Sequence, residues 1–111
     1  MTVYVDDMWK SPVGRFGRMR MSHMIASTED ELHAMAERLG LRRAWYQDGH
    51  YDVSLEKRRQ AVALGAVEIT FRQCGCMVAL RRATGVLGVP ETAVEEFRRL
   101  RGGIGASGDQ S

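Results

Sequence analysis

The sequence predicts an α/β fold: a single compact layered domain with a small mixed or partly parallel sheet and about four helices. Two observations lead to this prediction. Short runs of β-branched and aromatic residues alternate with amphipathic helical segments along the chain. The length of 111 residues suits one hydrophobic core and is too short for a second. The domain is expected over residues 1–101, followed by a disordered Gly/Ser-rich tail over 102–111.

The N-terminal half is predicted to contain two strands and a helix. Residues 2–5 read as a short strand and residues 21–26 as a second one. The intervening segment 8–20 contains one proline and two glycines, which predict a loop. Thr28, followed three residues later by Glu31, is a capping box that starts a helix.

The C-terminal half is predicted to contain three more helices. Asp48-Gly49 indicates a tight turn, either in a hairpin or in a loop that leads into a single strand. Ser54 caps a helix over 55–64, and residues 66–70 form a strand. A helix over 71–83 follows, and Pro90 suits the first turn of a last helix.

Composition excludes several classes of protein. The hydrophobic fraction of 44% and the charged fraction of 27% are those of a globular protein and not of a disordered chain. We expect no membrane association and a cytoplasmic location, because neither a long apolar run nor a signal peptide is recognisable. Cys74 and Cys76 are expected to be reduced, since their spacing on a helix directs them to different sides.

Several short motifs, taken in their order and spacing, resemble an uncharacterised family. They are Tyr4-Val-Asp-Asp7, His23, Glu31-Leu-His33, His50-Tyr-Asp52, Lys57-Arg58 and Gly65-Ala-Val67. The chain is similar over residues 1–70 to a domain-of-unknown-function family of small bacterial proteins, notably actinobacterial, and of phages. The resemblance implies a stand-alone protein encoded by a bacterium or a phage, with 71–101 as a helical extension. It implies no reaction and therefore no catalytic residues.

Acidic and imidazole side chains form the first candidate site. The candidate catalytic residues are Asp6, Asp7, His23, His50 and Asp52. If their strands are neighbours, they meet at one edge of the sheet and can supply a general acid and base. Without Asp7, the same set can bind a divalent cation such as Mg²⁺, Mn²⁺ or Zn²⁺. The alternative is structural: the Asp pair would bond turn N–H groups, and His23 would be a core residue.

Basic side chains form the second candidate site. Arg15, Arg18 and Arg20 are interleaved with glycine and Phe16, which suits binding of a phosphate chain with stacking of a base. The alternative is a solvated loop. Lys57 and Arg58 fall in the first turn of a helix, where a bound anion would offset their unfavourable position, and Tyr51 precedes them as a further candidate for ligand binding.

Three functions remain open on the sequence. The leading hypothesis is a binding protein that holds an anionic, phosphate-bearing ligand, either a nucleotide or a nucleic acid. The second is a metal-dependent phosphodiester hydrolase or nuclease, so that whether the protein is an enzyme stays open. The third is an interaction factor that binds a host protein or itself, with the last helix, Trp45 and Met77 as its candidate surface.

Overall fold

The computed structural model describes residues 2–109, and their side chains as far as Gly102. The chain divides into two units, one ending at Phe71 and the other starting at Arg72. Each is described here by itself. The candidate site residues all belong to the first unit.

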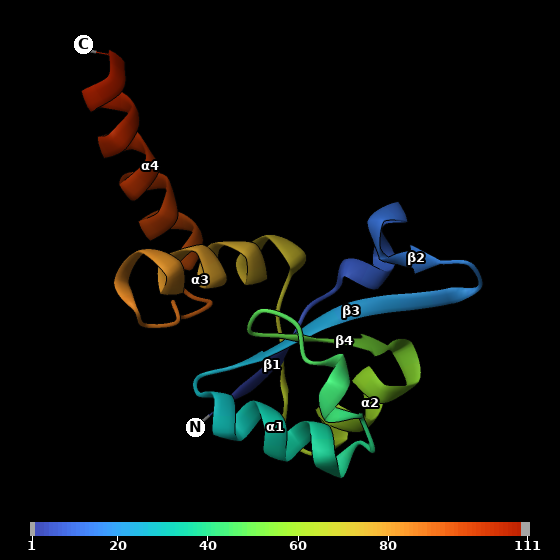
Figure 1. Ribbon diagram of the computed structural model, residues 1–111. Coiled ribbons are helices and arrows are strands. Elements are labelled where there is room, and N and C mark those ends of the chain that lie inside the picture. The colour runs from blue at the N-terminus through green and yellow to red at the C-terminus, as the bar shows by residue number, and fades with distance from the viewer. Residues whose placement is uncertain (1, 110–111) are drawn as a thin grey trace. The chain divides into compact units, whose positions relative to one another are not determined.

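The first unit is built on one mixed five-stranded sheet (Figure 1). Its strands are β1 (Val3–Val5), β2 (Arg15–Phe16), β3 (Met19–Ala26), β4 (Tyr51–Ser54) and β5 (Val67–Glu68). The long strand β3 pairs antiparallel with β1, β2 and β4, whereas β5 runs parallel to β1. The α/β class and the partly parallel sheet predicted from the sequence are therefore confirmed.

Two helices, α1 (Glu29–Arg38) and α2 (Leu55–Ala63), cover one face of this sheet (Figure 1). Alternate strand residues face them, so that Met24 on β3 and Val53 on β4 are fully buried in the same core as Leu32 of α1. The residues between them on β3 and β4 must point to the opposite face. His23 and Asp52 are among those residues.

The helix starts predicted at Thr28 and Ser54 are confirmed, whereas the last helix begins at Ala93, after Pro90. The Thr28 hydroxyl accepts a hydrogen bond from the N–H of Glu31, and the Ser54 hydroxyl accepts one from the N–H of Lys57. The Ser54 cap matters for the site because it ends β4 and fixes where α2 begins.

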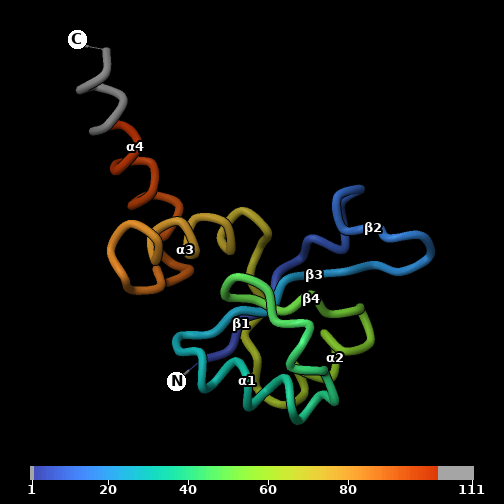
Figure 2. The backbone as a smooth tube through the Cα atoms, viewed as in Figure 1, coloured from blue at the N-terminus to red at the C-terminus, as the bar shows by residue number. Residues whose placement is uncertain are grey.

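The segment 8–20 is not the loop that its proline and glycines predicted. It forms two short 3₁₀ helices, η1 (Met8–Lys10) and η2 (Pro12–Gly14), and then the hairpin β2–β3. Gly17 has a φ of 63° and allows the tight turn that pairs Phe16 with Met19. The hairpin thus extends β3 beyond its pairing with β1, as the tube in Figure 2 shows.

The turn at Asp48-Gly49 leads into a single strand. Both residues have positive φ, 44° and 88°, and Gln47 and His50 form an isolated bridge across the turn. The residues before the turn form a 3₁₀ helix, η3 (Arg43–Trp45), and β4 pairs with β3. Of the two alternatives left open by the sequence, the loop that leads into one strand is the one observed.

The second unit consists of two helices and their connection. These are α3 (Phe71–Thr84), whose first residue belongs to the first unit, and α4 (Ala93–Asp109). The Gly88 N–H donates to the Met77 carbonyl across the connection. The tail predicted over 102–111 falls partly on residues 110–111, which lie outside the described residues, and the backbone of α4 reaches Asp109. Among the described residues, no helix is long and apolar enough to span a bilayer.

Candidate metal centre

Three side chains with metal-binding atoms gather on the sheet face that α1 and α2 leave uncovered. His23 on β3 and Asp52 on β4 are direct cross-strand partners, which places their side chains on the same face. His50 stands two residues before Asp52, so it points the same way. We call the three candidate ligands His23, His50 and Asp52 together the metal centre.

The distances within the metal centre suit one ion. His50 Nε2 lies 3.3 Å from Asp52 Oδ1, and His23 Nε2 lies 3.9 Å from the same oxygen. One ligand atom from each residue lies within 4.8 Å of the others. Ligand atoms held about 2.1 Å from a tetrahedral ion are themselves about 3.4 Å apart, so only a small movement is needed to close on a metal.

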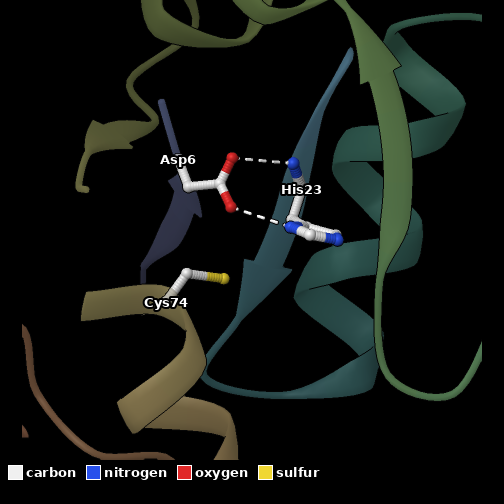
Figure 3. Close-up of side chains that lie close together, drawn as sticks. All are labelled: Asp6, His23 and Cys74. Atoms are coloured by element: carbon white, nitrogen blue, oxygen red, sulfur yellow. Dashed lines mark hydrogen bonds and ion pairs between the residues drawn. The ribbon is translucent and has the colours of Figure 1, made fainter. Parts of the chain in front are cut away.

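The Asp6 carboxylate faces the Nδ1 side of the His23 ring (Figure 3). This carboxylate is fully buried, and its Oδ2 lies 2.8 Å from His23 Nδ1. Its Oδ1 accepts the backbone N–H of His23 at 2.9 Å and that of Met8 at 3.1 Å. In the neutral imidazole, with Nδ1 as the donor to this carboxylate, Nε2 carries the free lone pair and faces His50 and Asp52.

The electrostatics of His23 follow from this arrangement. The hydrogen bond to Asp6 raises the pKa of His23 above its ordinary value, although partial burial of the ring acts in the opposite direction. The negative charges of Asp6 and then Asp52 raise this pKa further. Two carboxylates on opposite sides of one imidazole thus form a locally negative environment, which favours a cation.

Aromatic contacts limit the motion of the centre without closing it. The His23 ring meets His50 edge to face at 5.0 Å and stacks on Phe71 at 5.7 Å between centroids. The side chains of His23, His50 and Asp52 nevertheless stay 26%, 24% and 36% exposed. An ion bound by them would keep positions open toward solvent.

The other predicted acidic residue has a structural position. Asp7 Oδ1 accepts the N–H of Phe71 at 2.7 Å, so it fixes the end of the first unit. Asp6 was predicted to be a metal ligand together with Asp52. In the structure its carboxylate instead bonds Nδ1 of His23, the ring nitrogen that does not face Asp52. Of the five predicted acidic and imidazole residues, three therefore form one cluster and Asp6 supports it.

The predicted basic residues are dispersed. Arg15 and Arg20 are exposed cross-strand partners, and Arg20 is three residues from His23, so both lie on the ladder face opposite to His23. Arg18 is exposed in the hairpin turn. Lys57 is half-buried and lines the same cavity as Asp52. Lys57 is thus the predicted basic residue that lines the same cavity as Asp52 of the metal centre.

Arg58 is buried and forms part of the scaffold. Its Nε donates to the carbonyl oxygen of Asp6 at 2.7 Å, and its Nη1 donates to Glu68 Oε1 at 2.9 Å. It therefore joins the ends of the parallel strands β1 and β5 instead of facing a ligand. Spacing could have indicated this, because Arg58 falls three residues after Leu55 and three before the fully buried Ala61.

Tyr51 is also buried, on the helix side of the sheet. Its hydroxyl lies 2.8 Å from Nδ1 of His33, and both rings contact Tyr46. It does not face the metal centre, because it alternates with His50 and Asp52 along β4. Of the residues predicted for an interaction surface, Trp45 is about half exposed and Met77 is buried.

Comparison with known proteins gives a family and no activity. A family model described as protein of unknown function (DUF4031) matches residues 3–84. The match includes every residue of the metal centre and continues to the end of α3, past the residues 1–70 expected from the sequence. No match was found among the curated proteins or among the solved structures.

Proposed function

The chain belongs to the family described as protein of unknown function (DUF4031), and because this description names no activity, we propose a function from the metal centre. We propose that the protein binds a divalent first-row metal ion through His23, His50 and Asp52 and hydrolyses a phosphoester there. One observation carries the proposal: two imidazoles and a carboxylate lie within 4.8 Å of one another on a partly exposed face.

The donor set indicates which ions would bind. Imidazole nitrogen favours Zn²⁺ and Mn²⁺ over Mg²⁺, which prefers oxygen ligands and retains its water. Three protein ligands leave at least one coordination position open, which is the pattern of catalytic sites and not of structural ones. A metal bound in this way supplies a Lewis acid and an activated water.

The residues around the centre support a catalytic role. Asp6 holds Nδ1 of His23, so that Nε2 is directed to the ion as in other sites with a carboxylate behind a ligating histidine. Arg58 in turn holds the backbone of Asp6 through its carbonyl oxygen. The orientation of His23 is therefore fixed by buried groups that solvent does not reach.

An anionic substrate is favoured by Lys57. This cation lines the cavity that also includes Asp52, so it can approach a phosphate placed beside the metal. A phosphoester would meet one positive charge from the ion and one from the side chain. A metal-free anion site built on Arg15, Arg18 and Arg20 is less favoured, because Arg15 and Arg20 lie on the other face of the ladder.

Metal binding can be tested directly. Protein stripped with a chelator is titrated with Zn²⁺, Mn²⁺ and Mg²⁺ in a calorimeter. We expect one Zn²⁺ or Mn²⁺ per chain, no comparable Mg²⁺ binding, and loss of the site in His50→Ala. His33→Ala is the matched control, since this histidine bonds Tyr51 away from the centre. Equal Zn²⁺ affinity in wild type and His50→Ala would refute the metal centre.

Hydrolysis is tested separately with chromogenic phosphate esters. The metal-loaded protein is incubated with a nitrophenyl phosphomonoester and with the corresponding diester. We expect turnover that disappears in Asp52→Asn and persists in His33→Ala. A protein that binds the ion and turns over neither ester contradicts the hydrolase and retains only the metal site.

A further inference from the structure

A cavity of about 460 Å³ adjoins the metal centre. It lies within the first unit, and Asp52 belongs both to its wall and to the metal centre. Its other walls come from the hairpin end of β3, from the η3 segment and from the first turn of α2. The lining includes Met19, Met21, Trp45, Gln47 and Lys57.

Part of the cavity lining is apolar. Trp45 is 49% exposed and Met19 is 52% exposed, and both line this cavity, so their apolar surfaces are accessible to a ligand there. Met21 contributes a second thioether on the same face of β3, two residues from Met19. An indole and two flexible thioethers offer a surface on which a planar heteroaromatic ring can stack.

The rest of the lining includes polar groups. Lys57 supplies a cation, and Asp52 connects the cavity to the metal centre. Gln47 supplies an amide that can both donate and accept, as the edge of a base requires. The Arg42 guanidinium lies 5.9 Å from the centroid of the Trp45 ring and adds a second positive charge near the indole.

We propose that this cavity binds a mononucleotide, with its base on Trp45 and its phosphate between Lys57 and the metal centre. The proposal rests on the proposed function, because it names the substrate class of the same site. The volume lies in the range of small-ligand pockets, roughly 300–1,000 Å³, and suits one nucleotide better than a strand. Charge complementarity places the phosphate at the Lys57 end.

The test compares nucleotides with their parts. Binding of the non-hydrolysable phosphonate analogues of adenosine and guanosine monophosphate to protein loaded with Mn²⁺ is measured by calorimetry, beside the phosphonate analogue of ribose 5-phosphate and the free nucleoside. We expect the nucleotide to bind most tightly, with each part weaker by about tenfold or more. The ribose 5-phosphate analogue binding as tightly as the nucleotide analogue would overturn the base site, and no nucleotide binding would overturn the proposal.

Two exposed aromatic residues provide matched variants. Trp45→Ala removes the stacking surface and is expected to weaken nucleotide binding roughly 5- to 100-fold. Phe16→Ala removes a side chain that is 58% exposed on the hairpin and outside the cavity, and it should leave binding unchanged. Equal weakening in both variants, or weakening in Phe16→Ala alone, would overturn the assignment of the base to Trp45.

Failure of this proposal can be told apart from failure of the metal centre. Mn²⁺ and Zn²⁺ affinities are measured first without nucleotide, in wild type, Trp45→Ala and Lys57→Ala. We expect equal metal affinity in all three and weaker nucleotide binding in both variants. Metal binding without nucleotide binding refutes the proposed mononucleotide site but not the metal centre. Binding of a single-stranded oligonucleotide in place of a mononucleotide would also overturn the mononucleotide site. Absence of metal binding refutes the proposed function.

Discussion

Replacing Asp6 with asparagine should separate the support of the metal centre from the centre itself. The amide oxygen of the substituted side chain can still accept the N–H groups of Met8 and His23 that Asp6 Oδ1 accepts now. The amide nitrogen, however, can only donate to Nδ1 of His23, where the carboxylate now accepts. His23 would then carry its proton on Nε2, the atom directed toward His50 and Asp52, and would lose the lone pair needed for a metal.

The size of both effects follows from these contacts. One charge-assisted hydrogen bond at 2.8 Å is replaced by a neutral one while the two backbone bonds remain, so the unfolding free energy of the metal-free protein should fall by about 1–3 kcal/mol. Loss of the carboxylate behind a ligating histidine typically weakens metal binding 10- to 100-fold, or about 1.4–2.7 kcal/mol.

Two measurements and one control are needed. Urea unfolding of the chelator-treated protein gives the stability change, and competitive titration against a chromogenic chelator gives the Zn²⁺ affinity. Asp7→Asn is the matched control: it removes the same charge one residue away, and the amide oxygen that it introduces can still accept the Phe71 N–H. Zn²⁺ affinity within about threefold of wild type in Asp6→Asn, or an equal loss of Zn²⁺ affinity in Asp6→Asn and Asp7→Asn, would refute the tautomer argument.

The remaining predictions concern the scaffold around the centre. Arg58→Met should lower the unfolding free energy by about 3 kcal/mol in urea titrations, because the buried Asp6 carbonyl and Glu68 lose their donor. Tyr51→Phe should cost about 1 kcal/mol, through the lost bond to His33, and leave Zn²⁺ affinity unchanged in the same chelator assay. Since Asp6 raises the pKa of His23, that histidine stabilises the metal-free fold fully below its unfolded pKa, and this contribution is lost as the pH rises through the folded pKa. The thermal midpoint of the metal-free protein should therefore fall as the pH rises above about 6.5, the ordinary pKa of histidine, and it should fall less in His23→Gln; an equal fall in that variant would contradict this reasoning.

The sequence predicts well those parts of the fold that depend on neighbouring residues. Thr28 and Ser54 could be recognised as caps because each bonds an N–H three residues further on. His50 and Asp52 could be placed on the same face because side chains of a strand alternate. Asp48-Gly49 was informative because positive φ angles in consecutive residues favour this pair.

The assembly of the site depends on pairings between distant segments, and these could not be predicted. Asp6 contacts His23 only because β1 pairs with β3. Asp52 lies beside His23 only because β4 pairs with β3 and not with the aromatic residues that precede the Asp48-Gly49 turn. The basic residues were misjudged for a different reason. A local count of charges does not show which face of a ladder each arginine occupies, nor that Arg58 belongs to an apolar stripe.

The cross-strand pairing of His23 with Asp52 limits how the chain can change in length. A residue added between His50 and Asp52 would turn Asp52 toward the helices and bring an apolar neighbour out in its place, which would abolish the ligand set in one step. Among homologous chains, the interval from His50 to Ser54 should therefore keep its length.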